Sequence, residues 1–437
     1  MLRGTVEPAM ESVLEDGNET GFLGSIFERM EKRAKGIVDG FLDDDNRAQE
    51  AIVFPRYYGE LLAWAVDSVI KLKGAKIKRV IGYFSTEPIY TEVNTDYTEK
   101  QNILADGRIL AEIDRVKIVL SVSIDYSGLN VATLESTKEN GAVITRLAEE
   151  IEEYAKNNNF YRGKRLELRS GIKMVCLKEK SWNDVVIDEE IKKELRKNTI
   201  GFINNIKLWE ELGIPPKRGV LLEGEPGTGK TIICKALMTE ATGITCINAN
   251  AYAINRPGYI EEIFEAAEDL APCLLFIEDI DMVGQTRARP GSGSNPILVS
   301  LLGTMDGIEQ KTQVLTIATT NCLDSLDKAL SERPSRFDRI IKIDLPDKEQ
   351  RRTIIARLCE KIKLDEAGQE YLAGCSDGLT PAQIQEVVFT LAIEHEEPER
   401  CREEFSASTR TLDKTVQKIE NKNSTGLGFK SKNNGAF

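Results

Sequence analysis

A glycine-rich segment that ends in lysine and threonine is the part of this sequence best suited to chemistry. It reads Gly-Glu-Pro-Gly-Thr-Gly-Lys-Thr over residues 224–231 and fits the pattern G-x-x-x-x-G-K-[ST], after an apolar run at 219–222 and before a helical pattern. Glycines let backbone N–H groups surround phosphate oxygens, and a helix N-terminus adds positive potential. This context predicts a phosphate-binding loop rather than a glycine-rich turn without a ligand.

Two side chains of this loop have roles of their own. We expect Lys230 to reach the β- and γ-phosphates of a nucleotide and the Thr231 hydroxyl to ligate Mg²⁺. The residues expected to hold the nucleotide are Glu225, Pro226, Gly227, Thr228, Gly229, Lys230, Thr231 and Ile232.

Two adjacent carboxylates, Glu278 and Asp279, follow the fully apolar residues 274–277. In phosphoryl-transfer sites one such acid supports Mg²⁺ and the next polarises the attacking water. We therefore assign the magnesium role to Glu278, together with Thr231, and the role of catalytic base to Asp279. A surface turn after a strand is the alternative interpretation. Since aspartate is one methylene shorter than glutamate, we expect turnover to be slow.

Polar residues after a further apolar strand complete the candidate set. Asn321 follows the apolar run at 314–318 and two threonines, and its amide can hydrogen-bond the γ-phosphate or the attacking water. Arg333 and Arg336 follow, three residues apart and next to a proline, which suits bidentate contacts to phosphate oxygens. If they contact the nucleotide bound by a neighbouring copy of the chain, they are arginine fingers. The alternative is a solvated basic turn.

The elements that must position these residues alternate along the chain. Strand and helix patterns alternate over residues 181–346, which predicts a parallel sheet covered by helices on both faces. Residues 51–180 have the mixed patterns of an α+β domain and contain no catalytic motif. Residues 347–405 read as a helical lid, 1–50 as a helical or linker segment, and 406–437 as a polar, disordered tail.

Composition excludes several classes of protein. The 437 residues carry a net charge of −13, which argues against nucleic acid as a partner, and the single histidine rules out an H-E-x-x-H zinc protease. Eight scattered cysteines, none in a C-x-x-C pair, are typical of reduced thiols. No apolar stretch reaches the ~20 residues that span a bilayer. We therefore expect a cytoplasmic protein.

Taken together, these motifs resemble the AAA family of ATPases, over about residues 182–397. Further matching segments are Ile-Pro-Pro-Lys-Arg-Gly at 214–219, Ala-Pro at 271–272 and Leu-Leu-Gly-Thr-Met-Asp-Gly at 301–307. The Glu-Asp order, which reverses the family's usual Asp-Glu, is similar to the mitochondrial branch that translocates the Rieske protein. The central motifs also resemble the ATPase modules of AAA proteases and of valosin-containing protein.

The resemblance implies more than the residues alone. It implies a P-loop NTPase fold with a helical lid, ATP and Mg²⁺ as ligands, and a hexameric ring that hydrolyses ATP between subunits. It also implies that the ring pulls a protein through a central pore, with Tyr252 at the position of the family's pore-loop aromatic residue. A packed tyrosine is the alternative for Tyr252.

Two functions remain open at this stage. The first is an oligomeric protein-remodelling motor, in which the domain at 51–180 recognises a protein substrate or adaptor. The second is a nucleotide-state switch that assembles with ATP and recruits a partner without threading it. A nucleic-acid motor is disfavoured by the acidic charge balance.

Overall fold

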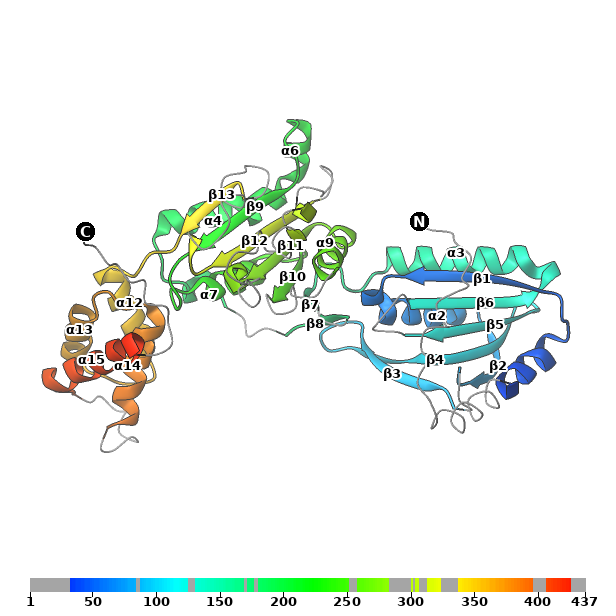
Figure 1. Ribbon diagram of the computed structural model, residues 1–437, viewed down its shortest axis with the longest axis horizontal. Coiled ribbons are helices and arrows are strands. Elements are labelled where there is room, and N and C mark those ends of the chain that lie inside the picture. The colour runs from blue at the N-terminus through cyan, green and yellow to red at the C-terminus, as the bar shows by residue number, and fades with distance from the viewer. Residues whose placement is uncertain are drawn as a thin grey trace, which may run out of the picture. The chain divides into compact units, whose positions relative to one another are not determined.

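The computed structural model describes residues 32–83, 87–124, 130–168, 171–176, 180–250, 258–282, 300–301, 303–305, 313–323, 337–395 and 406–425. The chain divides into two compact units (Figure 1). The first comprises residues 1–160 and 169–174, and the second comprises 161–168 and 175–437.

The first unit is built on an antiparallel sheet in the order β1-β6-β5-β4-β2, with β3 also paired to β4. The sheet buries consecutive residues in the middle of β4, which requires cover on both of its faces. Residues 32–42 form a helix that packs on Ile81, Leu110 and Val119, and α2 and α3 pack on each other and on the sheet. The bounds are β1 Arg47–Phe54, α2 Gly59–Leu72, β2 Lys76–Ile81, β3 Ile89–Asn94, β4 Lys100–Ile113, β5 Val116–Ser123, β6 Asn130–Thr137, α3 Gly141–Asn157 and β8 Ile172–Met174.

The second unit contains a parallel sheet in the order β13-β9-β12-β11-β10-β7. Strand β12 is buried along its whole length and β11 up to its last residue. Helices that cover both faces of a parallel sheet bury its central strands, which are therefore predominantly apolar. The bounds are β7 Arg165–Leu168, α4 Glu189–Asn198, α5 Ile200–Asn204, α6 Ile206–Glu211, β9 Arg218–Glu223, α7 Lys230–Glu240, β10 Thr245–Asn250, α9 Tyr259–Asp269, β11 Cys273–Glu278, β12 Val314–Thr320 and β13 Arg339–Lys342.

In the described part of the chain after the sheet, four helices share one apolar core. They are α12 Lys348–Leu358, α13 Glu366–Cys375, α14 Pro381–Ile393 and α15 Thr409–Thr425. Three of them begin at side-chain caps: Asp347, Asp365 and Thr380 each accept a backbone N–H of the first turn. The fold class predicted from the sequence, a parallel sheet with helices on both faces, a helical lid and a preceding α+β domain, is confirmed.

Helix α15 corrects one prediction. The sequence composition suggested a disordered tail over 406–437, but residues 409–425 are helical. Leu412, Val416 and Ile419 lie at helical spacing and are buried in the core of the lid. The polar majority of the segment concealed this narrow apolar stripe.

Within the described residues, no helix is both long enough and apolar enough to cross a membrane. The cysteines described there are free thiols, and Cys234, Cys246, Cys273 and Cys359 are buried. Burial raises the pKa of the Cys246 thiol to about 12. Burial also raises the pKa of Cys234, Cys273 and Cys359, which favours the protonated thiol over the thiolate.

Candidate active site

The phosphate-binding loop predicted from the sequence connects β9 to α7. Gly227 and Gly229 have φ angles of 86° and 105°, in the region that favours glycine. A Cβ atom on Gly227 would also lie 2.9 Å from both the Thr380 Oγ1 and the Ala382 Cβ atoms of the lid. The loop therefore needs glycine at 227 for its own turn and for the close approach of α14, whose Ala382 N–H donates to Gly227 O at 3.2 Å.

Lys230 begins α7 with only 6% of its surface exposed. Its ammonium group donates to Gly224 O at 2.6 Å, Glu225 O at 3.0 Å and Asn321 Oδ1 at 2.9 Å. Burial lowers the pKa of Lys230, and the carboxylates of Asp279 and Asp281 oppose that shift. The result is a desolvated cation beside a helix N-terminus, an arrangement that suits phosphate oxygens.

Glu278 lies at the end of β11 and both of its carboxylate oxygens are held. Thr231 Oγ1 donates to Glu278 Oε2 at 3.0 Å, and Asn248 Nδ2 donates to Oε1 at 3.4 Å. Thr231 and Glu278, the two residues expected to ligate Mg²⁺, are therefore in contact. Their hydroxyl and carboxylate oxygens are the hard donors that Mg²⁺ prefers. These residues fit the ion, and when bound it neutralises charge on the phosphates.

Asp279 and Asn321 are joined across the ends of β11 and β12. Asn321 Nδ2 donates to Asp279 Oδ1 at 3.2 Å, while the Asn321 backbone N–H donates to Asp281 Oδ1 at 3.1 Å. Since Asn321 also accepts from Lys230, one network of hydrogen bonds connects the lysine, the amide and the candidate base. These residues lie at the same edge of the sheet because β9, β12 and β11 are parallel and their carboxyl ends are neighbours.

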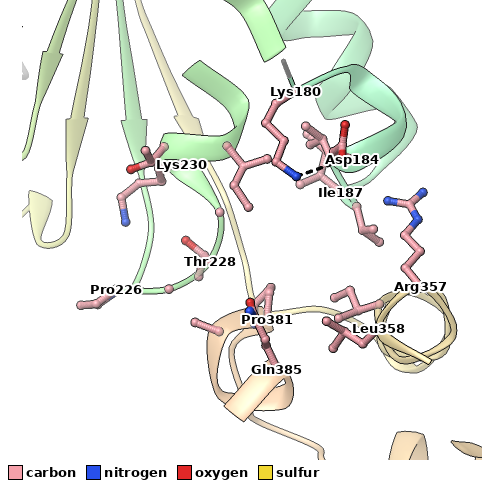
Figure 2. Close-up of a pocket in the computed structure, with 18 of the residues that line it drawn as sticks. Lys180, Asp184, Ile187, Pro226, Thr228, Lys230, Arg357, Leu358, Pro381 and Gln385 are labelled. Atoms are coloured by element: carbon pink, nitrogen blue, oxygen red, sulfur yellow. Dashed lines mark hydrogen bonds and ion pairs between the residues drawn. The ribbon is translucent and has the colours of Figure 1, made fainter. Parts of the chain in front are cut away.

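Lys230, Thr231, Asp279 and Asn321 line a cavity of about 560 Å³ (Figure 2). Its polar end contains the phosphate loop, Asp279 and Asn321, and its other end is lined by lid side chains, including Leu358, Pro381 and Gln385. Figure 2 shows Lys230 and Thr228 on one side, and Pro381 and Gln385 on the lid helix facing them. A volume of this size is in the range of ligand pockets.

The apolar end of the cavity was not found from the sequence. It is formed by Val185, Val186, Ile187, Ile354 and Leu358. The first three follow a 3-10 turn at Trp182–Asp184, where the Trp182 Nε1 atom donates to Glu240 Oε2 at 2.5 Å at the end of α7. Two apolar segments about 170 residues apart meet here, and no local periodicity indicates such a meeting.

Asn248 and Thr319 were also missed. Asn248, on β10, donates to the Glu278 carboxylate. Thr319, on β12, accepts from the backbone N–H of Asp279. Only the register of the strands brings them there. Of the other predicted site residues, Tyr252, Arg333 and Arg336 lie outside the part of the chain that the structure describes.

Comparison with known proteins agrees with this geometry. Residues 220–345 match the "ATPase family associated with various cellular activities (AAA)". The proteasome-activating nucleotidase of Sulfurisphaera tokodaii is 33% identical over 302 residues, which cover 65% of this chain and 73% of that protein. The chain belongs to the AAA family of ATPases. The resemblance to this family inferred from the motifs is confirmed.

Other AAA relatives are matched over a smaller part of their length. The ATP-dependent zinc metalloprotease FtsH 2 of Sphaerobacter thermophilus is 36% identical over 232 residues, which are 49% of this chain and 34% of that protein. The proteasome-activating nucleotidase of Saccharolobus solfataricus is 38% identical over 211 residues, 46% of this chain and 53% of that protein. The chain thus spans about a third to a half of these two AAA proteins.

Proposed function

We propose that this AAA chain binds ATP with Mg²⁺, hydrolyses it, and acts as an oligomeric motor that remodels protein substrates. The observation that carries the proposal is the hydrogen-bonded series Lys230, Asn321 and Asp279 on a cavity lined by both the phosphate loop and the lid. Membership of the AAA family supports it, as does similarity to an ATP-dependent zinc metalloprotease and to a proteasome-activating nucleotidase.

In this proposal each residue has one task. Lys230 pairs with the terminal phosphates, Asn321 positions the attacking water, and Asp279 takes the proton of that water. Thr231 and Glu278 hold the magnesium ion. Arg333 and Arg336 complete the site from the neighbouring subunit of a ring, six-membered as the family resemblance implies, and residues 51–180 engage the protein substrate or adaptor. Tyr252 contacts the substrate in the pore.

The first test separates binding from hydrolysis. Lys230→Ala abolishes ATP binding, measured by calorimetry, whereas Lys235→Ala on the same helix is the matched control and binds normally. Asp279→Asn binds ATP but lowers kcat by about 100-fold or more, the range expected for loss of a general base. Undiminished hydrolysis in Asp279→Asn shows that this residue is not the base.

A second test addresses the motor. An ATP-dependent unfolding assay with a fluorescent substrate is run on the wild type and on Tyr252→Ala. Loss of unfolding with ATP hydrolysis intact supports threading; equal unfolding by both proteins removes Tyr252 from the mechanism. If the wild type assembles with ATP and recruits a partner without unfolding it, the result supports a nucleotide-state switch and contradicts a motor.

A third test asks whether the arginines act in trans. Arg336→Ala subunits are mixed with wild-type subunits at increasing ratios. Trans action lowers the turnover per wild-type subunit as the variant fraction rises, while an arginine acting within its own subunit gives simple dilution.

A further inference from the structure

The backbone of Asp279 is in an unusual conformation for a residue on the cavity. Its φ angle is 54°, in the left-handed region that L residues other than glycine rarely adopt. Aspartate and asparagine enter this region more readily than longer side chains such as glutamate. Directly after β11, the chain thus turns in a way that an ordinary strand end does not.

Thr319 supplies the contact that accompanies this turn. The backbone pairs between β11 and β12 end at Ile277 and Ala318. Beyond this pair, the backbone N–H of Asp279, two residues after Ile277, donates to Oγ1 of Thr319, one residue after Ala318, at 2.9 Å. A side-chain hydroxyl therefore takes the place of the next rung of the ladder.

Thr319 is well placed to fix its neighbour. It lies on β12, which is paired on both sides, and only 2% of its surface is exposed. A buried side chain on a central strand has little freedom, so its hydroxyl is a fixed acceptor. The Asp279 carboxylate, in turn, accepts from the amide of Asn321 two residues after Thr319.

We infer that Thr319 is a positioning residue for Asp279: it holds the left-handed turn that aims this short carboxylate at the cavity. The inference rests on the proposed ATPase function. It also accounts for the order Glu278-Asp279, because the left-handed conformation favours aspartate at the second position. The reach that aspartate lacks is offset by the turn of its backbone.

The reaction that this geometry serves is hydrolysis by water. The water oxygen bonds to the γ-phosphorus while the bond from that phosphorus to the β–γ bridging oxygen breaks, giving ADP and phosphate. Asp279 takes the proton that the water loses. If the Asp279 carboxylate is displaced slightly from the attacking water, the nucleotide still binds but this step is slower.

The test compares Thr319→Val with Thr319→Ser in the full chain. Valine keeps the shape and loses the hydroxyl, and serine keeps the hydroxyl. We expect Thr319→Val to bind ATP with an unchanged Kd and to lower kcat by about 10- to 100-fold, and Thr319→Ser to stay near the wild type. Thr316→Val, a buried threonine in the middle of the same strand, is the matched control.

Three results overturn the inference: a wild-type kcat in Thr319→Val, equal losses in the serine and valine variants, or an equal loss in Thr316→Val. A double variant sharpens the test. If Thr319 acts through the base, adding Thr319→Val to Asp279→Asn lowers the residual rate no further; a further loss of full size assigns Thr319 another role. A wild type that hydrolyses no ATP refutes the proposed function instead, and is recognised before any variant is made.

Discussion

Lys230 is a cation that the fold keeps away from water, and its protonation is therefore linked to stability. Burial lowers its pKa below the ordinary value of 10.5. In the window between the lowered pKa and 10.5 the unfolded chain binds a proton that the folded chain does not, so raising the pH stabilises the fold. The stability contributed by this group is lost as the pH falls through that window.

The corresponding prediction compares the wild type with Lys230→Met. As the pH rises toward 10.5, the free energy of unfolding of the wild type increases relative to that of the variant, because methionine does not titrate. Urea denaturation of both nucleotide-free proteins at several pH values measures the difference. A difference that is flat or falls with pH contradicts the lowered pKa.

At the scale of residues, sequence reasoning located those candidate site residues that lie close together in the chain. Lys230 and Thr231 follow the glycines directly, so the motif alone indicated the phosphate loop. Thr231 and Glu278 were assigned to the same ion, and their side chains are in contact. Asn248 and Thr319 carry no such local signal, because their contacts depend on which strands are neighbours and in which register.

At the scale of elements, the phosphate loop and the lid meet at a point with no space for a side chain. Gly227→Ala places a Cβ 2.9 Å from Thr380 and Ala382 and forces alanine into a left-handed backbone. We expect weaker ATP binding and a cost of about 1–3 kcal/mol in stability. Gly374→Ala in α13 meets no atom within 4 Å and is the control, with an expected gain of about 0.5–1 kcal/mol. Thermal melts with and without ATP distinguish the two.

Helix α15 belongs to the lid and contributes to its core. Ile419 is 3% exposed, whereas Ile393 on α14 is 76% exposed. Ile419→Ala is expected to lower the free energy of unfolding by about 2–5 kcal/mol. Ile393→Ala is expected to change it by no more than about 0.5 kcal/mol. Chemical denaturation measures both; equal effects refute the packing of α15.

Fully buried elements were the easier ones to predict. The apolar run at 274–277 gave β11 within a residue, since a central parallel strand is apolar throughout. The long strand β4 was missed: its residues 100–113 mix polar and apolar side chains, because part of it is exposed and part is covered on both faces. In α15 three apolar residues in seventeen were too few to outweigh the polar composition.

At the scale of the molecule, the boundary between the two units is not a single point in the sequence. Residues 161–168 belong with the second unit, where β7 pairs with β10 and buries Leu166 and Leu168. The sequence analysis placed these residues in the range 51–180, because an isolated four-residue strand carries no mark of the sheet that it joins.

This arrangement predicts how the chain can be divided. A fragment of residues 161–437 keeps β7 and is expected to unfold cooperatively and to bind ATP. A fragment of residues 181–437 loses β7, leaves the edge of β10 unpaired, and is destabilised by about 1.5–3 kcal/mol for each of the two leucines. Thermal melts and light scattering compare them; equal stability refutes the role of β7.

The three oxygen atoms around Lys230 make ligand entry an exchange rather than an addition. The ammonium group already donates to oxygens of Gly224, Glu225 and Asn321, so a ligand that accepts a hydrogen bond from it must displace one of these oxygens. The negative charge of phosphate oxygens makes their hydrogen bonds to the ammonium group strong enough to offset the lost protein contact. A nucleoside without phosphates forms no such bond. Discrimination between a nucleotide and its nucleoside is thus already present in the resting protein, as the cost of separating Lys230 from its own partners.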